Sequence, residues 1–146
     1  MRILGIDYGD RHIGLALSDP LLITAQPLGA YTPSGRASVD GQYFRDLVAR
    51  HDVGEIVLGN PLRMDGSSGT RAEKTRSFAA WLEKTVGRPV TLLDERLTTR
   101  QALKTLDDEK LRGRKKKEWE DQIAAVIILS TYLERKRGTD DVPEGR

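Results

Sequence analysis

The stretch "RILGIDYGDRHIGLALSD", residues 2–19, predicts two apolar strands joined by a tight turn. Residues 2–7 form the first strand, the turn lies at Gly9 and Asp10, and residues 12–19 form the returning strand. A third apolar stretch, residues 23–31, completes a meander in which Pro27 marks an edge or an irregularity. The chain therefore opens with an antiparallel sheet.

Helices and strands alternate along the rest of the chain. Apolar residues at helical spacing predict helices around residues 44–51, at 70–86 and at 119–137, and a capping box at Thr98 and Gln101 predicts another helix. Short apolar runs predict strands at 55–59 and 89–95. This order predicts an α/β fold, a mixed five-stranded sheet with helices on both faces.

Length and composition indicate one soluble domain. The chain has 146 residues, 38% hydrophobic and 32% charged, and it contains no apolar run of the ~20 residues that span a bilayer. We expect a single domain over residues 1–137 and a disordered tail over 138–146, which lacks apolar content. The N-terminus has none of the features of a secretory signal, so the expected compartment is the cytoplasm.

The residue types also restrict any metal site. The chain has no cysteine and two histidines, which excludes disulfides, thiolate zinc sites and an all-histidine site. A metal would have to be held by oxygen atoms, which favours Mg²⁺ or Mn²⁺.

Basic residues cluster in one segment, although the formal net charge is only +2. The run "KLRGRKKK", residues 110–117, holds six basic residues and no acid. Such a cluster is typical of phosphate binding, and it is equally the composition of a solvated loop.

Acids stand where apolar elements meet loops. Asp7 ends the first strand, Asp94 and Glu95 end a later one, and Asp121 lies in the first turn of the last helix. Sites in open α/β sheets lie beyond the carboxyl ends of the parallel strands, so these carboxylates can share one edge. Acids that converge in this way repel one another unless a cation neutralises them, and convergence therefore implies a metal.

Each acid also has a purely structural explanation. Asp7 can stabilise the turn that follows it, and Asp94 or Glu95 can be an ordinary charge at a strand end. Asp121 near a helix N-terminus is favoured by the helix dipole whatever its function. The sequence pattern alone leaves both explanations open.

Four blocks of the sequence together resemble one family. They are "GIDYGDRHIGLALSD", "GNPLRMDGSSGTRAEKTRSFAAWL", "LLDERLTTRQA" and "EDQIAAVIIL", and they occur in this order along nearly the whole chain. The combination resembles the YqgF family, also called RuvX. The resemblance implies an RNase H-like fold related to the RuvC resolvases, and a cytoplasmic nuclease that matures the 5′ end of the small-subunit (16S) ribosomal RNA precursor.

The resemblance also implies the catalytic acids. The family's first aspartate corresponds to Asp7, the acid of its DER motif to Glu95, and its final acid to Asp121. On a strand Asp94 would point away from Glu95, so one of the two is expected at a shared site. Two Mg²⁺ or Mn²⁺ ions held by Asp7, Glu95 and Asp121 suit hydrolysis of a phosphodiester bond.

Other residues are candidates for binding the nucleic acid. The segment "MDGSSG" offers the Ser67 and Ser68 hydroxyls at the start of a helix, as an anion site or as an ordinary cap. Arginines within the family blocks are candidates for backbone contacts, and the basic run adds affinity that falls with salt. These basic candidates are Arg11, Arg76, Arg96, Arg114, Lys115, Lys116 and Lys117, of which Arg76 is equally a solvated helix charge.

Three other functions compete with RNA processing. Resolution of four-way DNA junctions requires paired active sites and hence a dimer, whereas processing one RNA end does not, so the expected state is a monomer or a homodimer. A non-catalytic nucleic-acid-binding factor is a third possibility, against which the acids at all three positions argue. An ATP-binding protein of the actin and sugar-kinase type is set aside, because the chain is too short for the second domain such proteins need.

Overall fold

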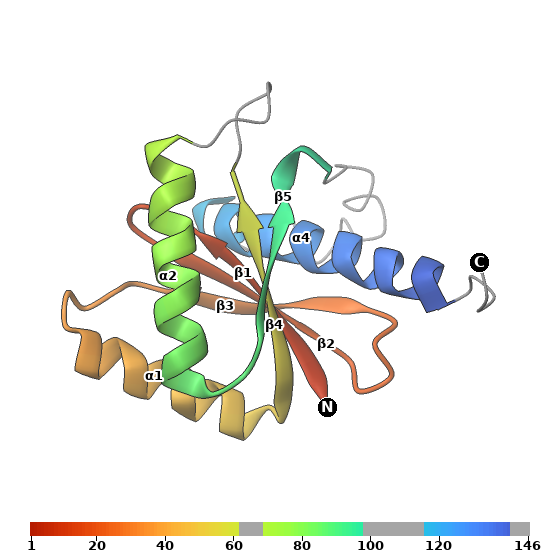
Figure 1. Ribbon diagram of the computed structural model, residues 1–146, viewed down its shortest axis with the longest axis horizontal. Helices are drawn as coiled ribbons and strands as arrows, with labels where there is room; N and C mark the ends of the chain where they lie inside the picture. The colour runs from red at the N-terminus through yellow and green to blue at the C-terminus, as the bar shows by residue number, and fades with distance from the viewer. Residues whose placement is uncertain (62–68, 98–115, 141–146) are drawn as a thin grey trace.

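The structure is a computed structural model that describes residues 1–61, 69–97 and 116–140, the backbone alone at residues 97, 116–121 and 139–140. The described chain forms one five-stranded sheet in the order β3-β2-β1-β4-β5 (Figure 1). The strands are β1 (Arg2–Tyr8), β2 (Ile13–Ser18), β3 (Ala25–Tyr31), β4 (Val53–Asn60) and β5 (Val90–Asp94). The helices are α1 (Ala37–Arg50), α2 (Thr70–Val86), a 3₁₀ turn η1 (Glu95–Leu97) and α4 (Lys116–Asp140).

The sheet is mixed, as predicted. Strands β1, β2 and β3 pair antiparallel, whereas β4 pairs parallel with β1 and β5 parallel with β4. The Gly9 amide donates to the His12 carbonyl in the first hairpin, and a Cβ on Gly9 would lie 2.7 Å from that oxygen. The predicted irregularity at Pro27 is confirmed, because the β2–β3 register shifts beside it and β3 is an edge strand.

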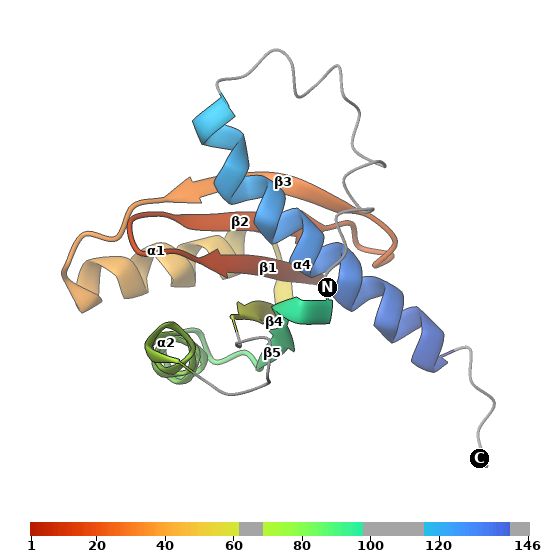
Figure 2. The ribbon, with the colours of Figure 1, turned by 90° about the horizontal axis from the view of Figure 1, so that it is seen from above.

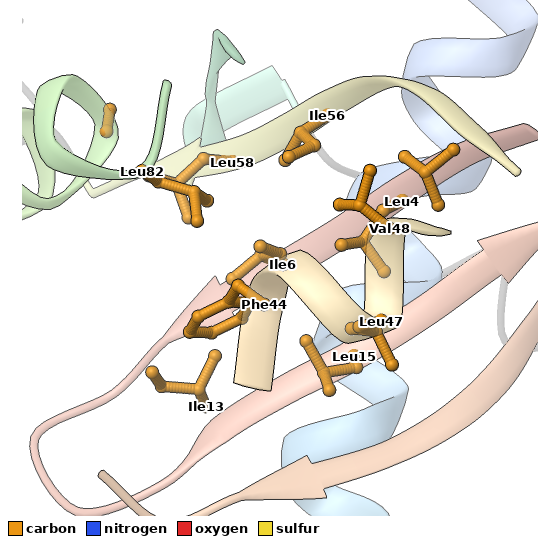
Figure 3. Close-up of a cluster of buried hydrophobic side chains, with 12 residues drawn as sticks. Leu4, Ile6, Ile13, Leu15, Phe44, Leu47, Val48, Ile56, Leu58 and Leu82 are labelled. Atoms are coloured by element: carbon orange, nitrogen blue, oxygen red, sulfur yellow. The ribbon is translucent and has the colours of Figure 1, made fainter. Parts of the chain in front are cut away.

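Helices cover both faces of the sheet, as Figure 2 shows, with α4 on one side and α1 and α2 on the other. The α1/α2 face holds large apolar side chains, among them Phe44 and Leu82, both completely buried (Figure 3). The α4 face is built from Ile3, Ala16, Val57 and Leu93 of the sheet and residues 125–133 of α4. Because side chains alternate along a strand, even-numbered residues of β1 face α1 and α2, and odd-numbered residues face α4.

Close approach of α4 depends on a glycine. A Cβ on Gly5 would lie 2.7 Å from the Leu129 Cβ and 3.1 Å from the Ala125 carbonyl oxygen, so α4 packs directly on the β1 backbone. Further along α4, Tyr132 and Lys136 both bond to Glu55 near the start of β4, the latter at 2.9 Å. The helix therefore runs against the direction of β1, and its N-terminal part lies toward the carboxyl ends of β1 and β4.

The observed elements correct one expectation and extend others. Glu95 was expected to end a strand, but it begins η1, because the Asp94 carboxylate accepts the Arg96 amide at 3.0 Å and turns the chain. The last helix covers Lys116–Asp140, longer than the predicted 119–137, and β4 extends beyond 55–59 at both ends. The helix predicted to start at Thr98 lies outside the described residues, as do residues 141–146 of the expected tail.

Candidate active site

Asp7 occupies the carboxyl end of β1, on the face that α4 covers. It pairs with Gly14 of β2, is partly buried, and lies two residues after Gly5, where α4 touches the strand. The β1 backbone is hydrogen-bonded on both sides, to β2 and to β4. The sheet therefore fixes the position of this carboxylate.

Glu95 brings a second carboxylate to the same place from the neighbouring end of β5. Its carboxylate lies over Gly59 of β4, where a Cβ would be 2.7 Å from Glu95 Oε1. Burial raises the pKa of Glu95, and the negative charge of Asp7 raises it further, while Arg71 works in the opposite direction. Strand β4 lies between β1 and β5, so the missing side chain at Gly59 leaves the space that Glu95 occupies.

Asp94 is directed to a different partner. Its carboxylate accepts hydrogen bonds from the Arg96 side chain, the shortest at 2.6 Å from Nη2. The Arg96 side chain is the main reason why the pKa of Asp94 is lowered. The expected separation of Asp94 from Glu95 is thus produced by the turn at η1, and not by alternation along a strand.

Asp121 lies in α4, one turn before Ala125, and its side chain is outside the described part of the structure. Ala125 is the residue whose carbonyl approaches Gly5, two residues before Asp7. Because α4 runs against β1, position 121 lies further toward the end of β1 at which Asp7 is found. The backbone thus places all three predicted acids at one end of the sheet.

The predicted nucleic-acid contacts are spread over several elements. Arg11 is exposed at the tip of the β1–β2 hairpin, Arg76 is exposed on α2, and Arg96 pairs with Asp94. Lys116 and Lys117 are the first residues of α4, with side chains outside the described part. Ser67, Ser68, Arg114 and Lys115 also lie outside it.

Three residues of this region were missed by sequence reasoning. Gly59 makes room for Glu95, Arg71 in the first turn of α2 is close enough to influence it, and Asn60 ends β4 opposite Asp94. The Asn60 Oδ1 atom is buried without a partner among the described residues. A glycine and an amide directly after a buried strand are the signal that sequence reasoning could have used, whereas nothing local distinguishes Arg71.

The donor set fits a hard divalent cation. The Asp7 and Glu95 side chains are both partly buried, and the pKa of Glu95 is raised first by burial and then by the negative charge of Asp7. Among the residues whose side chains are described, there is no group of three or more potential metal ligands. The third expected ligand, at position 121, belongs to the part that is not described.

Proteins of known structure share this fold. Thermus thermophilus RuvC, solved with a Holliday junction substrate, superposes with a TM-score of 0.59 at 20% identity, over 95% of this chain and 97% of its own. Yeast mitochondrial Ydc2, a Holliday junction resolvase, gives a TM-score of 0.56 at 13% identity over 94% and 80%. The fold is therefore that of the RNase H-like resolvases.

The family is more specific than the fold. The family model RuvX, described as Holliday junction resolvase, matches residues 1–135, and the chain belongs to this family. A Lachnospira eligens protein named "Putative pre-16S rRNA nuclease" is 45% identical over 94% of this chain and 99% of its own length. A Koribacter versatilis protein of the same name is 43% identical over 95% and 90%. The resemblance seen in the sequence is confirmed.

Proposed function

We propose that this chain is a metal-dependent nuclease that processes the 5′ end of the 16S ribosomal RNA precursor in the cytoplasm. The observation that carries the proposal is the Glu95 carboxylate over Gly59 at the carboxyl end of the sheet, close enough to Asp7 for the Asp7 charge to act on it. Its relatives of 45% and 43% identity carry the name of such a nuclease. In the described residues no helix is long and apolar enough to cross a bilayer.

The residues that would hold Mg²⁺ or Mn²⁺ are Asp7, Glu95 and Asp121. When bound, a pair of such ions activates the attacking water and stabilises the leaving oxygen of a phosphodiester. The residues themselves supply fixed positions, because Asp7 is part of a strand paired on both sides and Glu95 rests on the β4 backbone. The positive charge of Arg71 acts to lower the pKa of Glu95. The same guanidinium would contact the negatively charged phosphate of the substrate.

Nucleic-acid binding would extend from this centre in two directions. Arg11 is exposed at the tip of the hairpin, and Lys116 and Lys117 are the first residues of α4; we propose that all three contribute positive charge to nucleic-acid binding. Contacts of this kind hold the phosphate backbone irrespective of base sequence.

Resolution of four-way DNA junctions is the second candidate function. The family model carries that description, and the fold is shared with a RuvC solved on a Holliday junction substrate. Symmetrical cleavage of a junction requires two active sites in one assembly, whereas trimming an RNA end can be done by a monomer. The oligomeric state on junction DNA therefore bears directly on this alternative.

Cleavage of end-labelled substrates tests the proposal. Precursor RNA spanning the 5′ end of the small-subunit RNA and a four-way DNA junction are incubated side by side with Mg²⁺, Mn²⁺ or EDTA. We expect RNA cleavage that needs the metal, is lost in Asp7→Asn and survives in Asp10→Asn, a matched change at an exposed position. Junction cleavage lost in Asp7→Asn would instead establish the resolvase, and no metal-dependent cleavage of either would leave a binding factor.

A further inference from the structure

An aromatic cleft lies on the opposite face of the sheet from the acids, beside the end of β1. Tyr8, Phe78 and Trp81 line it, and its volume is about 500 Å³. The Tyr8 and Phe78 rings are stacked with centroids 4.3 Å apart, and Trp81 lies 5.7 Å from Phe78. Tyr8 of β1 and Phe78 and Trp81 of α2 are all only partly buried, whereas Leu82 of α2 is completely buried. Aromatic surface is therefore open to a ligand here.

The rim of the cleft is polar and comes from one flank of α2. Lys74, Ser77 and Glu73 are all exposed and line the opening. Lys74 supplies a positive charge, the Ser77 hydroxyl can donate or accept, and the Glu73 carboxylate accepts from N–H groups. A phosphate is disfavoured next to Glu73, whereas the amino and imino groups of a base are favoured there.

The position of the cleft ties it to the proposed active site. Tyr8 directly follows Asp7, and the two side chains leave β1 on opposite faces at the same end of the strand. A nucleic-acid strand with a phosphate at Asp7 would thus pass the mouth of the cleft within a short length of backbone.

We propose that this cleft binds an unpaired nucleobase of the substrate against the exposed aromatic surface of Tyr8, Phe78 and Trp81, while the neighbouring backbone passes around the end of β1 toward Asp7. The inference rests on the proposed nuclease function and defines its substrate class as nucleic acid that is single-stranded beside the cleaved bond. A base in a duplex keeps both faces against its neighbours, so only an unpaired base can stack on a protein ring. Stacking tolerates any base.

Blocking the cleft tests the proposal without removing a buried residue. Ser77→Tyr adds a ring at an exposed position on the cleft rim, and Ala80→Tyr adds the same ring at an exposed α2 position that does not line the cleft. Both variants are made in an Asp7→Asn background, and binding is measured by anisotropy with three labelled probes. The probes are a short single-stranded RNA, an abasic strand of equal length and an RNA duplex.

We expect the single strand to bind at least fivefold more tightly than the abasic strand. Ser77→Tyr should abolish this difference, Ala80→Tyr should keep it, and duplex binding should be equal in all three proteins. With Trp119 replaced by Phe, the fluorescence of Trp81 should be quenched by the single strand and not by the abasic one.

Two results would overturn the inference, and they are distinguishable. In the first, Ser77→Tyr in the Asp7→Asn background binds all three probes as its parent does, and the Ser77→Tyr single variant cleaves RNA with Mg²⁺ at the wild-type rate. The cleft then has no role, and the nuclease function stands. If the parent protein binds none of the probes and the wild type cleaves no nucleic acid, the proposed function fails together with the inference.

Discussion

The two faces of the sheet are packed in opposite ways. On the α1/α2 face, large side chains such as Phe44 and Leu58 fill the space between helices and sheet, and both are completely buried. On the α4 face, Gly5 and Ala125 let the helix touch the strand, and Gly59 leaves space for a carboxylate. Both faces thus hold buried apolar clusters that stabilise the fold. The difference is that the α4 face also leaves space for a carboxylate beside the β4 backbone.

The largest effect is expected from emptying the α1/α2 face. Phe44 is completely buried and contacts Phe78 and Trp81 edge-on, so Phe44→Ala should lower the free energy of unfolding by about 4 kcal/mol. Urea denaturation measures the loss. Val39→Ala, an exposed change on the same helix, should stay within about 0.5 kcal/mol of the wild type. A loss below about 1 kcal/mol in Phe44→Ala would contradict the packing contrast.

Filling the space on the α4 face should damage the site as well as the fold. A Cβ at Gly59 would lie 2.7 Å from Glu95 Oε1 and 2.5 Å from Ile128 Cδ1, so Gly59→Ala should cost about 2 kcal/mol and greatly reduce RNA cleavage. Gly54→Ala on the same strand is the control, because its Cβ would meet only the flexible, exposed Met1 side chain among the contacts found. Wild-type cleavage by Gly59→Ala would show that the position of Glu95 is not needed.

Removing one charge from the α4 face should stabilise the metal-free protein. Asp7 contributes to the raised pKa of Glu95, which means that the two carboxylates repel each other. In EDTA, Asp7→Asn should therefore raise the free energy of unfolding by about 1 kcal/mol, whereas Asp10→Asn should change it little. Thermal melts with and without Mg²⁺ check this, and the wild type and Asp10→Asn should gain from the metal, whereas Asp7→Asn should not. Destabilisation of Asp7→Asn in EDTA would contradict mutual repulsion.

The smallest effect concerns a polar contact at the edge of the α1/α2 face. The Tyr31 hydroxyl donates to Asp40 at 2.5 Å; this bond raises the pKa of Tyr31 to about 12, above its ordinary 10.0. Burial opposes ionisation of Asp40, but hydrogen bonds from Tyr31 and Ser34 hold its pKa below the ordinary 3.8. The pair therefore stabilises the fold fully between about pH 3.8 and pH 10. This stabilisation is lost at lower pH as Asp40 is protonated at its lowered pKa, and at higher pH as Tyr31 ionises at about 12.

Comparison of Tyr31→Phe with the wild type across pH measures this contribution. The difference in urea midpoint should be constant between about pH 5 and 9 and should shrink at both extremes. It should correspond to less than about 1 kcal/mol, because the pair is partly exposed. A difference that does not vary with pH would show that the Tyr31 hydroxyl does not act through its hydrogen bond to the Asp40 carboxylate.

Much of the fold could be predicted from the sequence because its signals are local. The hairpin follows from two apolar runs on either side of the turn at Gly9, and α2 lies where helical spacing placed it, from Thr70 to Val86. The turn at Glu95 was missed, because it depends on the Asp94 side chain capturing the Arg96 amide. Local propensity does not report such a side-chain choice.

The site was predictable in part, for a related reason. Asp7 and Glu95 were found from their place at strand ends and from the family resemblance, and in the structure the charge of Asp7 acts on Glu95. Gly59 and Arg71 act on Glu95 across elements that are far apart in sequence. Their roles follow from strand order and helix placement, which no single stretch of sequence encodes.

Binding of Mn²⁺ to the protein without nucleic acid tests the central claim most directly. Free Mn²⁺ is followed by electron paramagnetic resonance while wild-type protein and single variants are titrated. If the acids share one metal site, Asp7→Asn, Glu95→Gln and Asp121→Asn should each weaken binding at least tenfold, and Asp94→Asn should bind as the wild type does. Equal binding by Asp7→Asn and the wild type would contradict a shared site.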